Sequence, residues 1–209
     1  MAVSKQQERP VLKRLCVFCG SNRGTLPEYT SAVRSLGREL ADRQIGLVFG
    51  GGGVGLMGEI ADAVLDAGGQ VVGVLPHSLG SKEIAHPDVE DLRIVGSMHE
   101  RKALMSELSD GFIAAPGGYG TLEELFEQLT WGQLGIHRKP CGLLNVAHYF
   151  DPLLAFLDSS AQQKFIRPQH RETLLAADTA EDLIAQLETY QPPQVDKWLD
   201  FEPRDSNRT

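Results

Sequence analysis

Glycine-rich turns that follow short apolar segments constrain the fold of this chain more than any other feature. Residues 45–49 (IGLVF) lead into four consecutive glycines at 50–53, and residues 111–115 (GFIAA) lead into PGGYGT at 116–121. A segment of helical periodicity follows each turn. Glycine lets the backbone adopt positive φ and approach a ligand closely, and a helix start attracts anions. Both turns are therefore candidate phosphate-binding loops.

The same alternation of strand and helix runs through the whole chain. Strands are expected at about 11–19, 45–49, 70–75, 91–95, 111–115, 140–146 and 173–177, and helices at about 27–42, 55–67, 97–108, 121–134, from 151 onward and at 179–190. Apolar strands separated by helices are typical of a parallel sheet covered on both faces. The pattern predicts an α/β fold, a Rossmann-like three-layer αβα sandwich with a mainly parallel sheet of six to seven strands.

Domain organisation and compartment follow from length and composition. No linker divides the chain, so we expect residues 1–209 to form a single nucleotide-binding domain with a core of about 12–190 and polar termini at 1–10 and 192–209. The net charge of −8 argues against nucleic-acid binding. The first residues do not resemble a secretion signal, and no apolar run approaches the ~20 residues that span a bilayer. We expect a cytoplasmic protein with no membrane partner.

The cysteines and histidines give no sign of redox or metal chemistry. Cys16 and Cys19 have C-x-x-C spacing, but they lie in an expected strand, where side chains three positions apart point to opposite faces. Buried, unreactive thiols are expected. The histidines are scattered along the chain without the spacing of metal ligands, so we expect no metal site.

Two common nucleotide-binding motifs fit poorly. Residues 50–55 (GGGGVG) have G-x-G-x-x-G spacing, but the next strand ends in VLPH at 74–77, without the acidic residue that binds the ribose of NAD. No G-K-[ST] follows any glycine loop, so a P-loop is also absent from the sequence. The pattern favours a nucleotide or phosphate site that belongs neither to a dehydrogenase nor to a P-loop NTPase.

Two helices carry charged side chains toward this site. Arg101 and Lys102 project about 100° apart near the start of the helix expected at 97–108, so one can reach the ligand while the other serves the surface. Thr121 and Glu124 match a capping box, in which Glu124 would be a helix cap and nothing more. Glu124, Gln128 and Trp131 lie opposite the apolar stripe of their helix, an outer face that we expect to meet a second subunit in a homodimer.

Three segments are distinctive as a set: GGGVGLMG at 51–58, MHERK at 98–102 and PGGYGTLEE at 116–124. Together they resemble the Lonely Guy (LOG) family of cytokinin riboside 5′-monophosphate phosphoribohydrolases, and the resemblance covers roughly residues 12–190. The resemblance implies hydrolysis of the N-glycosidic bond of an N6-substituted AMP to a free base and ribose 5-phosphate, with no cofactor. The family has also been labelled possible lysine decarboxylase, but no lysine stands in a recognisable pyridoxal-phosphate setting.

The resemblance also implies roles for individual residues. The catalytic arginine of the family falls on Arg101 and its signature glutamate on Glu124. Ser97 departs mildly from the acidic residue that is frequent in the family. The candidate substrate contacts are Ser21, Gly52, Gly53, Glu83, Met98, Lys102, Gly117, Gly118, Tyr119, Gly120, Thr121, Leu122, Glu123 and Thr130.

Three other functions remain open at this point. The chain can be an AMP nucleosidase that acts on unmodified AMP. It can also be a non-catalytic carrier of a nucleotide or of the molybdenum cofactor, since the molybdenum-cofactor carriers share this Rossmann-like plan and a glycine-rich phosphate loop. A DNA-processing relative is a third alternative, and the acidic balance argues against it. The joint presence of Arg101, Lys102 and Glu124 favours the enzyme.

Overall fold

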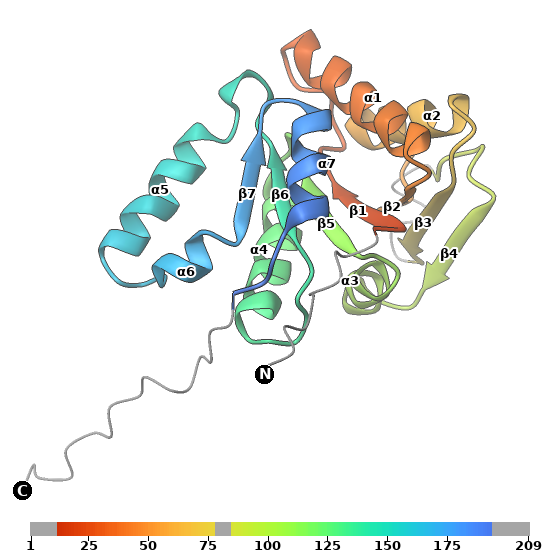
Figure 1. The fold of residues 1–209 in the computed structure, drawn as a ribbon. Helices are drawn as coiled ribbons and strands as arrows, with labels where there is room; N and C mark the ends of the chain where they lie inside the picture. Colours follow the sequence, from red (N-terminus) through yellow and green to blue (C-terminus); the bar gives the residue numbers. More distant parts are fainter. Residues whose placement is uncertain (1–11, 78–84, 194–209) are drawn as a thin grey trace, which may run out of the picture.

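Seven short strands form one parallel sheet in the computed structural model, which describes residues 12–77 and 85–193. The strands are β1 (Arg14–Phe18), β2 (Gly46–Phe49), β3 (Val71–Pro76), β4 (Asp91–Val95), β5 (Gly111–Ala114), β6 (Cys141–Leu144) and β7 (Leu174–Ala177). They lie in the order β4-β3-β2-β1-β5-β6-β7 (Figure 1). Each neighbouring pair is parallel, which confirms the predicted fold class.

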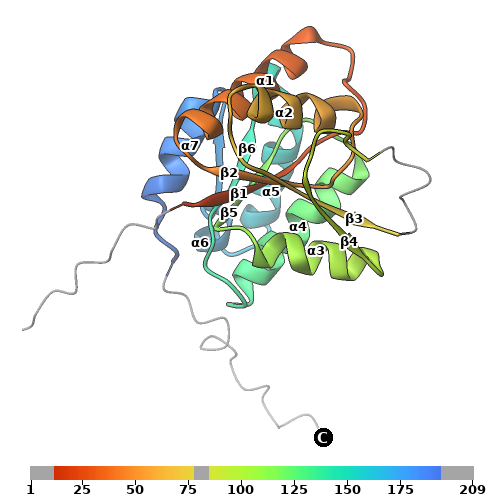
Figure 2. The same ribbon diagram turned by 90° about the vertical axis from the view of Figure 1, so that its right-hand side faces the viewer.

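Helices cover both faces of this sheet and form two separate cores (Figures 1 and 2). One face carries α1 (Pro27–Asp42), α2 (Gly55–Asp66) and α7 (Ala180–Thr189), and the other carries α3 (Met98–Glu107), α4 (Tyr119–Gln133) and α5 (Asp151–Gln162). The short α6 (Pro168–Arg171) and the 3-10 turn η1 (Val146–His148) were not expected from the sequence. The predicted three-layer sandwich is thus present in the described residues.

The two cysteines near the end of β1 illustrate how the strand serves both cores. Cys16 packs into the core on the α3–α4 side, and Cys19 packs into the core on the α1–α2 side. Both are buried and free, and burial raises the pKa of both thiols. The prediction of buried thiols on opposite faces is confirmed.

The strand order reverses at β1, and this reversal places the glycine loops together. Strands β1 to β4 follow one another outward to one edge of the sheet, and β5 then lies on the other side of β1. Ligands of open α/β sheets bind where such a reversal opens a crevice beyond the carboxyl ends of the strands. Gly20, after β1, joins all three loops: its N–H donates to the carbonyl of Pro116 (3.0 Å), and its carbonyl accepts from the N–H of Leu56 (3.0 Å).

Gly55, at the start of α2, is the glycine that this arrangement needs most. Its φ is +61°, and a Cβ there would overlap the backbone of Ser21 and Asn22. We expect Gly55→Ala to lower the free energy of unfolding by more than the ~1–2 kcal/mol of left-handed strain alone. Gly68→Ala is the matched control, because Gly68 has φ +73° with open space around it. Urea unfolding of both variants measures the difference, and equal losses would contradict the tight packing of the loops.

Candidate active site

A cavity of about 390 Å³ opens at the strand-order reversal. Its walls come from the loop after β1, the start of α2, the loop after β5 with the first turn of α4, and the segment after β6. The side chains that carry charge or hydroxyl groups into this lining are Ser21, Arg23, Tyr29, Arg101, Tyr119, Thr121, Glu124 and Tyr149. Of the two candidate phosphate-binding loops, the turn after β5 lines the cavity, whereas the glycine run after β2 does not, and that region contributes only Leu56 and Met57 from the start of α2.

Arg101 and Glu124 form an ion pair that lines this cavity. Nη1 of Arg101 donates to Oε1 of Glu124 at 3.0 Å, and the two residues are only 6% and 8% exposed. The remaining guanidinium nitrogens bind main-chain carbonyls: Nε donates to Val74 (3.1 Å) and Nη2 to Gly50 (3.3 Å). Such a network fixes the orientation of the arginine and, through it, that of the carboxylate.

Gly50 has a function that the sequence did not reveal. A Cβ at this position would overlap Nη2 of Arg101, so the glycine provides space for the guanidinium group. Sequence reasoning assigned the whole glycine run to a ligand. The structure shows that its first residue instead accommodates a side chain from α3.

The prediction that Glu124, Gln128 and Trp131 form the outer face of α4 was wrong. Glu124 and Gln128 are buried against α3, where Ser106 Oγ donates to Gln128 Oε1 at 3.0 Å, and Trp131 is half-buried. Helix α3 packs beside α4 on the same face of the sheet, so α4 buries a second side in addition to its apolar stripe. The expected subunit contact through this face therefore loses its basis.

The capping-box hypothesis for Glu124 was also wrong. Helix α4 begins two residues earlier than expected, with Gly118 as its N-cap and no side-chain cap. Thr121 lies within the first turn, so Glu124 is not in the capping position. By contrast, Ser97 does cap α3, accepting from the Glu100 N–H at 3.1 Å.

The first turn of α4 presents main-chain N–H groups to the cavity. Gly117, Gly118, Tyr119, Gly120 and Thr121 all line it. The first N–H groups of a helix lack an intrahelical acceptor, and the helix dipole places about half a positive charge there. This end of the helix is suited to bind a phosphate group.

Two tyrosines of the wall were missed by sequence reasoning. Tyr149 Oη donates to the carbonyl of Gly117 at 2.6 Å, and this bond supports the glycine loop before α4. Its ring packs edge-on against Tyr29, with centroids 5.5 Å apart. Tyr149 follows β6, whose carboxyl end lies at the same edge of the sheet, and that position was the signal available in the sequence.

The predicted substrate contacts divide into two groups. Ser21 and the residues from Gly117 to Thr121 line the cavity, together with Arg101 and Glu124. The predicted contacts outside the lining are Gly52, Gly53, Met98, Lys102, Leu122, Glu123 and Thr130. Glu83 lies outside the residues that the structure describes.

Lys102 belongs to a separate ion-pair cluster. Its Nζ donates to Glu123 and, at 3.0 Å, to Glu127. Burial lowers the pKa of Lys102, but the hydrogen bonds to Glu123 and Glu127 outweigh burial, and the pKa ends above its ordinary value. The side chain therefore stays charged at neutral pH. It faces away from the Arg101 side of α3, as the 100° rotation between neighbouring helix positions predicts.

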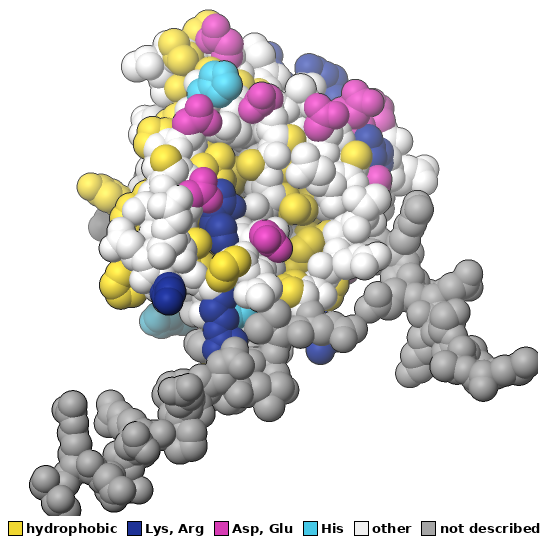
Figure 3. Space-filling model, turned by 60° about the vertical axis from the view of Figure 1, so that its left-hand side comes forward, with side chains coloured by type: hydrophobic (Ala, Val, Ile, Leu, Met, Phe, Trp, Pro, Cys, Tyr) yellow, Lys and Arg dark blue, Asp and Glu magenta, His cyan; other side chains and the backbone are white. Residues whose placement is uncertain are grey.

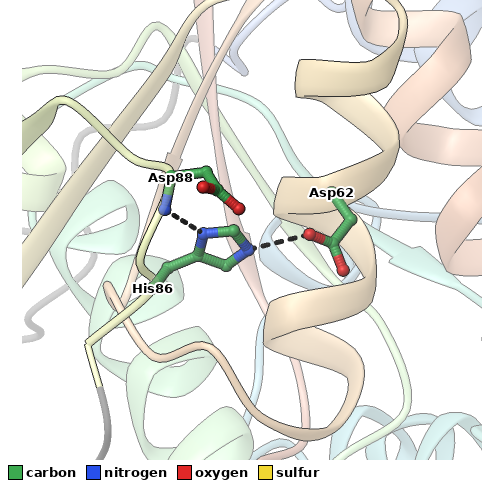
Figure 4. A group of neighbouring side chains, drawn as sticks. All are labelled: Asp62, His86 and Asp88. Carbon is green, nitrogen blue, oxygen red and sulfur yellow. Dashed lines mark hydrogen bonds and ion pairs between the residues drawn. The ribbon is translucent and has the colours of Figure 1, made fainter.

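One group of side chains has the composition of a metal site. Asp62, His86 and Asp88 place one potential ligand atom each within 4.8 Å of one another (Figure 4), although the sequence showed no ligand spacing. Nε2 of His86 lies 3.0 Å from Asp62 Oδ1, and Nδ1 accepts from the Asp88 N–H at 3.3 Å. Both ring nitrogens thus have partners, and the ring connects α2 to the segment after residue 84.

Comparison with known proteins identifies the family. The model of the family described as possible lysine decarboxylase matches residues 57–187. A probable cytokinin riboside 5′-monophosphate phosphoribohydrolase of Oryza sativa subsp. japonica is 53% identical over 180 residues, covering 86% of this chain and 79% of the relative. A cytokinin riboside 5′-monophosphate phosphoribohydrolase of Arabidopsis thaliana is 49% identical over 187 residues, covering 90% and 86%. The chain belongs to the LOG family.

Solved structures place this LOG-family chain in a wider fold group. The molybdenum cofactor carrier protein of Chlamydomonas reinhardtii has a TM-score of 0.65 at 21% identity, covering 87% of this chain and 97% of that one. The molybdenum cofactor binding protein of Rippkaea orientalis gives 0.64 at 23%, with 88% and 98% covered. Identities this low show only a shared fold, so the ligand and the activity have to be inferred from the residues of the site. Among the described residues, no helix of this LOG-family chain is long and apolar enough to span a membrane.

Proposed function

We propose that this LOG-family chain hydrolyses the N-glycosidic bond of N6-substituted AMP, the nucleotide of a cytokinin riboside, to a free base and ribose 5-phosphate. Two features support this activity. Relatives at about 50% identity bear the name of that enzyme. The cavity also brings a buried Arg101–Glu124 ion pair close to an exposed helix start.

The exposed start of α4 supports phosphate binding at this end of the helix. The N–H groups from Gly118 to Thr121 and the helix dipole stabilise a phosphate dianion there. Glu124 lies just over one helical turn further along α4 and lines the same cavity. A nucleotide anchored by its phosphate thus has its ribose and glycosidic bond directed toward the carboxylate. Binding energy from the phosphate then serves to position the bond that breaks.

The carboxylate and the arginine have complementary chemistry in this position. Cleavage of an N-glycosidic bond places positive charge on the ribose and negative charge on the leaving base. The Glu124 carboxylate stabilises the cationic sugar and orients the attacking water. Arg101 holds this carboxylate in place and contributes positive charge at the cavity wall. Water is the co-substrate: its oxygen bonds to C1′ as the bond from C1′ to the base nitrogen breaks, and the proton that it loses ends on the departing base.

Three finer points belong to the same proposal. We infer AMP-type nucleotides as ligands, a cytoplasmic location, and a homodimer as the functional unit. Exposed apolar side chains lie along the α3–α4 layer, with Met98 (40% exposed) at the start of α3 and Leu134 (42%) and Ile136 (63%) after α4, and they support a subunit contact through this layer. On the face drawn in Figure 3, some basic side chains lie in a narrow central band, and others are scattered among acidic ones, a mixture of signs that favours small ligands over nucleic acid. Light scattering coupled to size-exclusion chromatography tests the dimer.

A substrate panel tests the activity. We expect N6-isopentenyl-AMP to give free base and ribose 5-phosphate, with kcat/KM at least about 100-fold above that of the matching unphosphorylated nucleoside, because a charge-assisted phosphate site contributes several kcal/mol. Plain AMP is compared in the same assay. A higher kcat/KM for AMP would assign the chain as an AMP nucleosidase, and tight nucleotide binding without any release of base would assign it as a carrier.

A further inference from the structure

Glu59 forms a buried contact point for two arginines beside the cavity. It lies on α2 with its side chain 5% exposed, and its two oxygens bind different partners. Oε1 lies 2.6 Å from Nη2 of Arg23, and Oε2 accepts from Nε of Arg34 at 2.5 Å. Arg34 is on α1, which packs along α2 (Figure 2), whereas Arg23 is on the loop after β1. One buried carboxylate thus fixes the positions of two guanidinium groups.

Only one of these two arginines belongs to the cavity. Arg23 is part of its lining, and Arg34 is not. Their side chains are 68% and 52% exposed, respectively. The two residues have the same chemistry and share a partner, so their difference is one of position. Arg23 stands at the wall formed by the loop after β1, with the first turn of α4 also in the lining.

The charges around the cavity make Arg23 important for an anion. Arg101, Glu124 and Arg23 are the charged side chains in the described lining. Arg101 and Glu124 neutralise each other through their ion pair. Glu59 neutralises only one of its two arginines, so that cluster retains one net positive charge next to the cavity. The uncompensated positive charge of the site therefore comes from the Glu59 cluster, and Arg23 is the member that reaches the ligand.

We propose that Arg23 binds the 5′-phosphate of the nucleotide together with the start of α4, and that Glu59 is its positioning residue. This inference rests on the proposed function and assigns a further phosphate contact within that site. A guanidinium has five N–H donors, and the bond to Glu59 engages Nη2, so the group can bind a phosphate oxygen while it stays paired. The buried anchor also reduces the side-chain entropy that an exposed arginine loses when it binds.

The test compares Arg23→Gln with Arg34→Gln in the full-length chain. Each variant removes one partner of Glu59, so effects on folding are matched, and only Arg23→Gln removes a cavity side chain. We expect Arg23→Gln to raise KM for N6-isopentenyl-AMP about ten-fold or more while kcat changes less than about three-fold, since one charge-assisted contact is lost. Arg34→Gln also removes one positive charge from the Glu59 cluster but no cavity side chain, so it is expected to raise KM much less than Arg23→Gln does. Arg23→Lys should recover part of the affinity, and Glu59→Gln should raise KM less than Arg23→Gln does.

Binding of ribose 5-phosphate, measured by calorimetry, provides a readout that does not depend on turnover. Its affinity should fall much further in Arg23→Gln than in Arg34→Gln, because only Arg23 lines the cavity. Equal KM and equal ribose 5-phosphate affinity in the two variants would overturn the role of Arg23, even if the wild type is an active hydrolase. If the wild type cleaves no nucleotide but Arg23→Gln still weakens ribose 5-phosphate binding, the proposed function fails and the phosphate contact stands.

Discussion

Glu124→Gln is expected to reduce kcat for N6-isopentenyl-AMP by roughly 10²–10⁴-fold. The amide retains the size of the carboxylate and an oxygen that can accept from Nη1 of Arg101. It loses the negative charge that opposes the developing charge on the ribose and that orients water. The variant should lose some stability, because the buried Arg101 charge keeps only neutral partners, but it should still fold and bind AMP. Chromatographic detection of the released base should show almost no turnover.

A matched control separates this effect from the loss of any carboxylate–arginine pair. Glu188, on α7 at the opposite face of the sheet, lies 3.0 Å from Nη1 of Arg43 and does not line the cavity. Glu188→Gln should retain wild-type kcat. Wild-type turnover in Glu124→Gln would reduce Glu124 to a structural partner of Arg101.

Arg101→Ala is expected to remove both activity and stability. The Glu124 carboxylate and the carbonyls of Val74 and Gly50 would lose a buried donor. Breaking a buried ion pair by removing one partner costs about 3–5 kcal/mol, because an uncompensated charge stays in the interior. Urea unfolding should show that loss, and base release should be undetectable.

The double variant Arg101→Ala/Glu124→Gln distinguishes the causes. It should be more stable than the sum of the two single changes predicts, because the second change removes the unpaired charge. Its activity should stay undetectable. An Arg101→Ala protein with wild-type stability and measurable turnover would show that the ion pair serves neither the fold nor the reaction.

The fold was predictable from the sequence because the local signals agree with one another. Uniformly apolar strands, glycine loops and helix-start residues all indicated the same parallel sheet, and α1 (Pro27–Asp42) and β4 (Asp91–Val95) have the predicted bounds. Within the described part of the predicted first strand, 12–19, only Arg14–Phe18 forms the strand, which pairs with β2 through residues 14–16 and with β5 through residues 15–18. Sheet pairing, which depends on distant residues, sets the ends of strands.

The environment of the candidate site was only partly predictable. Helical periodicity shows which side of α4 is apolar, but it does not show that α3 covers another side and buries Glu124 and Gln128. The use of Gly50 to accommodate Arg101 and the contact of Tyr149 with Gly117 both join residues that lie more than 30 positions apart. Such contacts arise from the tertiary arrangement, and periodicity along one segment carries no information about them.

The central claim is that a nucleotide binds with its phosphate at the first turn of α4 and its glycosidic bond beside Glu124. A crystal structure of Glu124→Gln with AMP measures this directly, because the slow variant should retain intact nucleotide. The account predicts phosphate oxygens within hydrogen-bond distance of the N–H groups from Gly118 to Thr121, with C1′ of the ribose next to residue 124. A nucleotide bound elsewhere, with that helix start unoccupied, would contradict it.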